Sequence, residues 1–256
     1  MTLLAVERIK LFSTRSPWWC ILVTFVLGVG PIALIFGLTP NNPENNAELN
    51  TGTTVAFYGL AMMVILVMAI IAITNEYRFG TIRETFKAVP NRTAVLLSKA
   101  TLVALVSGVA GEVTAFAAWG VAKLVRPSAD IAIDTASEWR TVAGVGLVFA
   151  LAALLAFAVG TLLRSTAAAV SIVLVWALLV ENLVLLIPRA GDEIKTWMPF
   201  TAVDRFITAG AGEAGGEGGG VGLQYPYGPW GGLGYFAAVA IGLLIVAVVV
   251  AERRDA

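Results

Sequence analysis

Six long apolar stretches constrain the fold of this chain more than any other feature of its sequence. Each holds about twenty or more mostly apolar residues, the length that an α-helix needs to cross ~30 Å of hydrocarbon. They run from Trp19 to Leu38, Thr54 to Ile73, Val95 to Gly120, Thr141 to Leu163, Ala168 to Pro188 and Gly232 to Ala251. The sequence therefore predicts an all-α integral membrane protein with six transmembrane helices, folded as a single domain over residues 1–256.

Composition argues against most soluble and catalytic classes. Hydrophobic residues make up 58% of the 256 residues and charged residues 13%, against roughly 25% charged residues in soluble domains. Lys and Arg number 17, as do Asp and Glu, so no basic excess favours a nucleic-acid partner. Histidine is absent and Cys20 is the only cysteine, which removes the commonest metal ligand and general base. We expect no catalytic residue, metal site or cofactor on this chain.

Basic residues in the connecting segments predict the orientation of the spans. If the spans alternate, one side of the membrane receives eleven Lys and Arg residues and the other receives six. The first set is Arg8, Lys10, Arg15, Arg78, Arg83, Lys87, Arg92, Lys99, Arg164, Arg253 and Arg254, and the second is Lys123, Arg126, Arg140, Arg189, Lys195 and Arg205. Because cytoplasmic loops carry the excess of Lys and Arg, both termini should be cytoplasmic, in a multi-pass protein of the plasma membrane.

Residues 1–18, which precede the first span, have helical periodicity. The apolar face consists of Ala5, Ile9 and Phe12, and the polar face of Glu7, Lys10 and Thr14. An amphipathic helix of this kind lies in the membrane interface, where Trp18 and Trp19 would join the aromatic belt. The alternative is a solvated lead-in that only carries cytoplasmic positive charge.

The cytoplasmic loop at residues 74–94 predicts a short helix of its own. Gly80 ends the helix that leaves the second span, Thr81 and Glu84 have the spacing of a capping box, and Pro90 ends the unit. An apolar ridge on this helix is formed by Ile82, Phe86 and Val89. Nothing else in the sequence is an obvious cover for this ridge, so it predicts either a partner protein or contact with lipid headgroups.

The last connecting segment, residues 189–231, is long enough to hold structure of its own. Its first half has helical spacing on both sides of Pro199, which predicts two short re-entrant or interfacial helices. Its second half is dense in glycine, which predicts a mobile extracellular linker.

Two acidic residues, Glu112 and Glu181, lie inside predicted spans. A charged group at membrane depth costs roughly 2.5–3.5 kcal/mol on insertion scales, so each of them needs a physical reason. One interpretation places them on a substrate path, with Asn182, or makes them an ion-coupling pair. The other makes them protonated carboxyls bonded to neighbouring helices, with Asn182 as one partner.

Small residues at four-residue spacing predict where helices cross. The two stripes are Ser107, Gly111 and Ala115 in the third span, and Gly234, Ala238 and Gly242 in the last. Each stripe fits a crossing within the subunit or a dimer face. We expect the crossing within the subunit for both, because Gly and Ala are frequent throughout the chain.

Four segments of the chain resemble a known family. They are ERIKLFSTRSPWW near the start, EYRFGTIRETFKAVPNR after the second span, WMPF before the last span and RRD at the end. The chain as a whole resembles the six-span permease subunits of ABC type 2 exporters found in actinobacteria. The resemblance implies an amphipathic elbow helix over residues 3–16, and a coupling helix in the loop that docks on a separate ATPase subunit.

The resemblance also implies partners and roles for particular residues. Coupling to the ATPase falls on Glu76, Arg78, Gly80, Thr81, Arg83 and Phe86, to which the ridge adds Ile82. Permeases of this family work as homodimers or as pairs of related permeases. They assemble with two copies of a nucleotide-binding ATPase subunit, which hold ATP and Mg.

Three functions remain as interpretations of the sequence. No G-x-x-x-x-G-K-[ST] motif occurs, so another polypeptide must supply any P-loop ATP site. The first interpretation is a permease subunit, not itself an enzyme, that exports a hydrophobic or amphipathic substrate by alternating access. The second is an ion-coupled secondary transporter or channel that uses Glu112 and Glu181. A membrane enzyme ranks third, because no nucleophile with an acid and a base recurs on one membrane face.

Overall fold

The computed structural model describes residues 3–88, 91–188, 190–210 and 225–254, and every regular element in these ranges is helical. Within them, six segments are long and apolar enough to cross a membrane, which confirms the predicted multi-pass architecture. These segments are α2 (Arg15–Leu38), Thr51–Phe79 with α4 (Tyr58–Phe79), α6 (Arg92–Val125), α7 (Ala136–Leu163), Thr166–Leu186 with α8 (Thr166–Val175) and α9 (Glu181–Leu183), and α12 (Pro229–Arg254). The shorter helices are α1 (Leu3–Ser13), α3 (Pro43–Glu48), α5 (Thr81–Ala88), α10 (Gly191–Thr196) and α11 (Pro199–Thr208).

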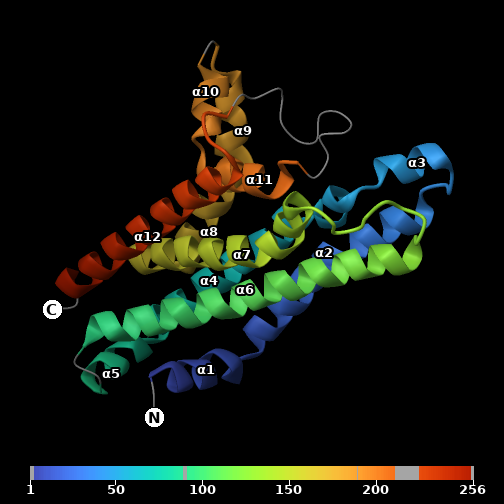
Figure 1. The fold of residues 1–256 in the computed structure, drawn as a ribbon. Coiled ribbons are helices and arrows are strands. Elements are labelled where there is room, and N and C mark those ends of the chain that lie inside the picture. The colour runs from blue at the N-terminus through green and yellow to red at the C-terminus, as the bar shows by residue number, and fades with distance from the viewer. Residues whose placement is uncertain (1–2, 89–90, 189, 211–224, 255–256) are drawn as a thin grey trace.

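Helix α7 is at the centre of the bundle, in contact with α4, α6, α8, α11 and α12 (Figure 1). Its side chains Phe149 and Phe157 are fully buried. Glycines let the neighbouring helices approach closely. A Cβ on Gly111 of α6 would lie 2.7 Å from the ring of Phe149, and one on Gly160 would lie 2.8 Å from Ile73 of α4. Side chains at these positions would push the helices apart, so the two glycines fix the crossings of α6 and α4 with α7.

The two stripes of small residues have different surroundings. In α6, Ser107, Gly111 and Ala115 are buried within the chain, as expected for a crossing inside the subunit. In α12, a Cβ on Gly234 or Gly242 would meet no atom within 4 Å. The expectation is therefore wrong for α12. The face of α12 that packs on the bundle is a different one and includes Phe236 and Ala240, both fully buried.

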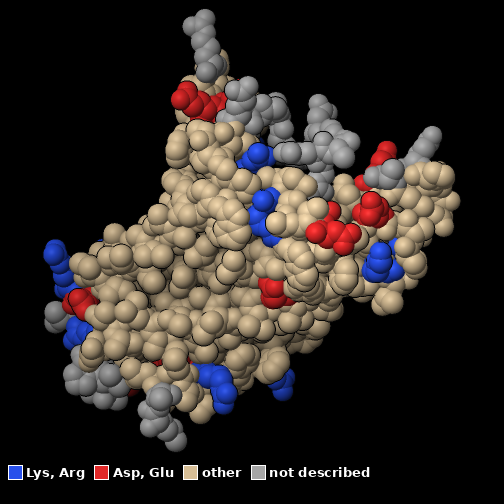
Figure 2. Space-filling view, in the orientation of Figure 1, with Lys and Arg blue, Asp and Glu red and all other residues tan. Residues whose placement is uncertain are grey.

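Both termini and the loop helix α5 lie at one end of the bundle, where α1 runs beside α5 (Figure 1). Helices α3, α10 and α11 lie where the spans end on the other side. Figure 2 shows the middle of the bundle as largely uncharged surface, interrupted in this view by a single acidic patch, with Lys and Arg gathered toward the ends. This arrangement fits spans that alternate in direction, while the identity of the membrane and the side of the termini stay predictions.

The N-terminal segment differs from its expected form in two ways. Helix α1 ends at Ser13, and extended backbone at Thr14, with φ −99° and ψ 151°, separates it from α2. Its orientation also differs: Glu7 of the expected polar face is buried, whereas Ile9 of the expected apolar face is exposed. The amphipathic pattern does not decide the orientation, because Glu7 forms an ion pair with Lys99 of α6. Trp18 and Trp19 are exposed at the start of α2, where an aromatic belt would lie.

The fifth span is interrupted near its middle. Helix α8 gives way to a π-helical turn at Trp176–Val180, and a 3-10 turn at Val184–Leu186 ends the span after α9. Turns of this kind inside helices occur frequently at functional positions. Beyond the span, α10 and α11 confirm the two short helices, with Pro199 as the first residue of α11. Most of the expected glycine-rich linker, residues 211–224, lies outside the described residues.

Candidate functional site

The loop between the second and third spans contains the predicted short helix. Gly80 ends α4 with a φ of +71°, a left-handed conformation that glycine adopts without strain. Helix α5 begins at the next residue, Thr81. The turn at Gly80 places α5 in contact with both α4 and α6.

The apolar ridge of α5 is covered at its first position. Ile82 is 4% exposed and belongs to the hydrophobic core of the bundle, so it is not available to a partner protein. The expectation of an uncovered ridge is wrong here, because the turn at Gly80 brings the start of α5 back onto the spans. Val89 and the side chains of Arg83 and Phe86 lie outside the described part of the chain.

Four exposed side chains surround the turn at Gly80, and we call them the turn surface: Arg78, Phe79, Thr81 and Glu84. Phe79 is 70% exposed, and the guanidinium carbon of Arg78 lies 5.6 Å from the centre of its ring. Aromatic side chains and arginine are enriched at protein interfaces. Arg78 and Thr81 are among the residues that the family resemblance implies, but Phe79 is not, because nothing distinguishes it from the other apolar residues of the helix that it ends.

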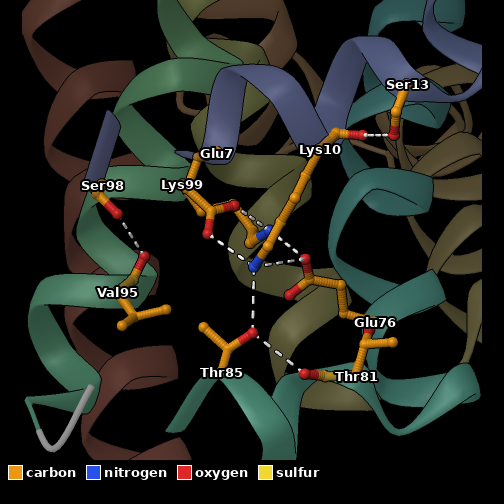
Figure 3. A network of polar contacts seen from close by, with 9 residues as sticks. All are labelled: Glu7, Lys10, Ser13, Glu76, Thr81, Thr85, Val95, Ser98 and Lys99. Carbon is orange, nitrogen blue, oxygen red and sulfur yellow. Dashed lines mark hydrogen bonds and ion pairs between the residues drawn. The ribbon is translucent and has the colours of Figure 1, made fainter. Parts of the chain in front are cut away.

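An ion-pair network lies beneath the turn surface and joins several helices (Figure 3). The ammonium group of Lys99, on α6, lies 2.5 Å from a carboxylate oxygen of Glu7 on α1, and 2.5 Å from one of Glu76 on α4. The side chain of Lys99 is only 6% exposed. A buried charge is tolerated only where it is well paired, and here one ammonium group is shared by two carboxylates.

Lys10 of α1 balances the charge of this network. Its ammonium group lies 3.1 Å from Glu7 and 3.9 Å from Glu76, so two cations face two anions. Lys10 also donates a hydrogen bond of 3.1 Å to the hydroxyl of Thr85, and that hydroxyl donates to the carbonyl of Thr81. The network thus ties α5 to α1, α4 and α6 (Figure 3).

A cavity of about 110 Å³ lies beside the ion-pair network. Its walls combine the four charged side chains with Pro17 of α2, Asn75 of α4 and Leu102 of α6. Protein interiors are otherwise close-packed, so this cavity is free space beside a buried group of charged side chains.

Glu181 is bonded to the N-terminus of α11. The backbone amides of Phe200 and Thr201 donate to its two carboxylate oxygens at 2.9 and 2.8 Å, and the Thr201 hydroxyl donates at 2.9 Å. These groups stand at the N-terminus of α11, where the helix dipole favours a negative charge. The contacts bond Glu181 to a neighbouring helix, as in the structural interpretation, but all three partners donate to its oxygens and none accepts a proton from it. The partner is α11 rather than Asn182, which accepts a hydrogen bond from Lys195 at 3.2 Å.

Glu112 has different surroundings from Glu181. It is half-buried on α6, on the wall of an apolar groove between α6, α7 and α12. A Cβ on Gly146 of α7 would lie 2.4 Å from a carboxylate oxygen of Glu112, so this glycine leaves the space that the carboxylate occupies. No residue of the fifth span lines the groove as far as the structure describes the chain. The structure therefore does not bring Glu112 and Glu181 together in one site.

A polar contact between α4 and α11 has no local sequence signal. The hydroxyl of Tyr58, on α4, donates to the carboxylate of Asp204, on α11, at 2.8 Å. Burial raises the pKa of Asp204, and this effect outweighs the lowering by the Tyr58 hydrogen bond and by the charge of Lys195. The two residues are 146 positions apart, so no periodicity or spacing could pair them.

Asp204→Asn should raise the melting temperature of the purified chain at neutral pH. A raised pKa means that the folded state holds this proton more tightly than the unfolded chain does. Protonated Asp204 therefore contributes fully to the stability of the folded chain below the ordinary carboxyl pKa. This contribution is lost as the pH rises through the pKa that Asp204 has in the folded state. Asparagine keeps an acceptor for Tyr58 without burying a charge, so its advantage should shrink in acid. Melting temperatures at acidic and neutral pH test this, and a lower value for the variant at both would contradict it.

No family model matches the chain, and no curated protein matches it. The functional interpretation therefore depends on the sequence patterns and on the geometry of the two ends of the bundle.

Proposed function

We propose that this chain is the membrane-spanning permease subunit of an ATP-driven ABC exporter, in which a separate ATPase subunit docks on the turn surface and α5. The observation that carries the proposal is the ion-pair network of Glu7, Lys10, Glu76 and Lys99. It links α5 to three other helices at the end of the bundle that holds both termini. A displacement of α5 by a partner would therefore act directly on the second and third spans.

The residues of the loop divide into two roles under this proposal. Arg78 and Thr81, with Phe79, offer exposed groups to the ATPase. Arg83 and Phe86, whose side chains lie outside the described residues, stay candidates for this contact from the family resemblance alone. Glu76 and Ile82 face the bundle and hold α5 in place, while Gly80 permits the turn between them. The chain itself hydrolyses nothing, because ATP and Mg bind the partner subunits.

The assembly that we propose contains two permeases and two ATPase subunits in the cytoplasmic membrane, with the termini on the cytoplasmic side. The spans α2, Thr166–Leu186 and α12 are the least buried in the bundle, which supports a second permease or lipid beside them. The second interpretation, an ion-coupled transporter, receives less support. It needs a free Glu181, and the carboxylate of Glu181 is occupied by the N-terminus of α11.

Phe79→Ala should remove most of the ATPase activity that co-purifies with the chain from membranes of its natural host. Buried aromatic anchors at interfaces contribute about 2 kcal/mol or more, which corresponds to about thirty-fold in affinity. The side chain is 70% exposed in this chain, so its loss should leave insertion and folding intact. The measurement is ATP hydrolysis in the eluate at matched expression of the chain.

Leu38→Ala is the matched control, because Leu38 is an equally exposed apolar side chain at the opposite end of the bundle. It should leave the co-purifying activity unchanged. Two results would contradict the proposal: activity that survives Phe79→Ala, or hydrolysis by the chain after all other polypeptides are removed.

A further inference from the structure

A groove with a volume of about 610 Å³ lies between α6, α7 and α12, on a different face of α6 from the ion-pair network. Its lining includes Leu105 and Gly108 of α6, Ala150 and Leu154 of α7, and Leu244 of α12. Along α6 the groove extends from Leu97 to Glu112, about 22 Å at the helical rise of 1.5 Å per residue. It therefore covers most of the ~30 Å thickness of the hydrocarbon layer.

Glu112 places an acidic group at one end of this groove. Among the lining residues that the structure describes, it is the only one with an ionisable side chain, and it lies at the outer end of the groove. Two glycines shape the wall around it. A Cβ on Gly146 would lie 2.4 Å from its carboxylate, and a Cβ on Gly108 would lie 3.2 Å from the carbonyl oxygen of Gly146. The crossing of α6 and α7 thus holds one carboxylate at the end of a long apolar groove.

We infer that this groove binds an amphipathic amine, with the ammonium group at Glu112 and the apolar chain along α6 toward Leu97. The inference rests on the proposed function, whose substrate class it names. A carboxylate attracts a cation more strongly where water is scarce, and the apolar walls favour an alkyl or aromatic body. An uncharged lipid chain would gain nothing from Glu112, and an anionic one would be repelled.

Charge also argues against a second copy of this chain as the occupant. A helix seated in the groove would need a cation at the depth of Glu112. The only basic residue inside the six predicted spans is Lys99, and its ammonium group is shared by Glu7 and Glu76. A small amine that enters from the lipid side meets the requirement directly.

The test is fluorescence binding of a dansyl-tagged long-chain alkylamine to the purified full chain in nanodiscs, without any ATPase subunit. An uncharged dansyl amide of the same chain length is the matched probe. Glu112→Gln should weaken binding of the amine at least about tenfold and leave the amide unchanged, because Gln keeps the size of the side chain and loses its charge. Ala150→Leu should weaken binding of both probes by filling the groove. Glu193→Gln, an exposed acid on α10, should change neither.

Three results would overturn the inference. Unchanged amine binding by Glu112→Gln would remove the role of the carboxylate, and unchanged amine binding by Ala150→Leu would place the amine elsewhere. Efficient disulfide cross-linking of two chains through Leu105→Cys, in a Cys20→Ser background, would assign the groove to a second copy. Because no ATPase takes part, these failures are distinct from a failure of the proposed coupling to ATP.

Discussion

Replacing Lys99 with methionine should destabilise the folded chain by about 3–5 kcal/mol, the largest loss that we expect from one side chain. The change leaves Glu7 and Glu76 together in a buried site, with the partly exposed Lys10 as the remaining cation of the network. Removal of one partner of a buried ion pair typically costs this much, because the opposite charge stays buried without compensation. Unfolding of the purified chain at neutral pH measures the loss.

A double replacement tests whether the loss arises from the network itself. Lys99→Met combined with Glu7→Gln removes one charge of each sign, so it should recover a large part of the stability lost in Lys99→Met. The stability changes caused by substitutions within one ion-pair network are not additive. A double variant whose loss of stability equals the sum of the two single losses would contradict the network. Lys123→Met, at a partly exposed position in the last turn of the same helix, should change stability by only about 0.5 kcal/mol, because Lys123 is not part of the network.

The network also explains why the orientation of α1 could not be predicted from sequence. The amphipathic pattern of residues 1–18 places Glu7 toward water, and it is a correct description of local periodicity. The competing interaction is the ion pair with Lys99, which is on another helix far along the chain. A shared buried ammonium group outweighs the exposure of Ile9, and no spacing rule contains that information.

The spans themselves could be predicted because an apolar run is a local property. The core of every predicted span lies within an observed helical segment, and only the ends differ. The third span is longer at both ends than its apolar run from Val95 to Gly120. At its start, the side chain of Asn91 accepts a hydrogen bond from the amide of Ala94, which extends α6 to Arg92. Polar caps of this kind lie outside the hydrophobic signal that defines a span.

The acidic residues inside the spans show a second limit of sequence analysis. Glu112 and Glu181 have the same chemistry and both lie inside predicted spans, so the sequence leaves open both a functional pair and two structural carboxyls. Their surroundings are decided by α11, which folds back beside α7 and α12 and presents its N-terminus to Glu181 alone. The helical spacing of residues 191–207 predicts that helix, but not the residue that caps it.

Glu181→Ala should release α11 from the fifth span and cost at least about 2 kcal/mol. The change leaves two backbone amides and the Thr201 hydroxyl without their acceptor in a buried site, and each such group typically costs 1–3 kcal/mol. Glu181→Gln keeps one oxygen acceptor and should cost less. The C-terminal end of α11 would stay attached, because Arg140 and Thr141 donate to the carbonyls of Phe206 and Ile207, each at 2.8 Å.

This two-ended attachment makes the loss of Glu181 measurable as a local opening of α11. Ile207 is fully buried at the attached end, whereas Thr201 is at the end that Glu181 caps. In a Cys20→Ser background, a cysteine at position 201 should become reactive to a thiol reagent when Glu181 is replaced by Ala, while one at position 207 should stay protected. The opening would be absent if Glu181 served a substrate path instead, since α11 would then not depend on its carboxylate. Equal protection at position 201 with and without Glu181 would therefore return Glu181 to the functional candidates.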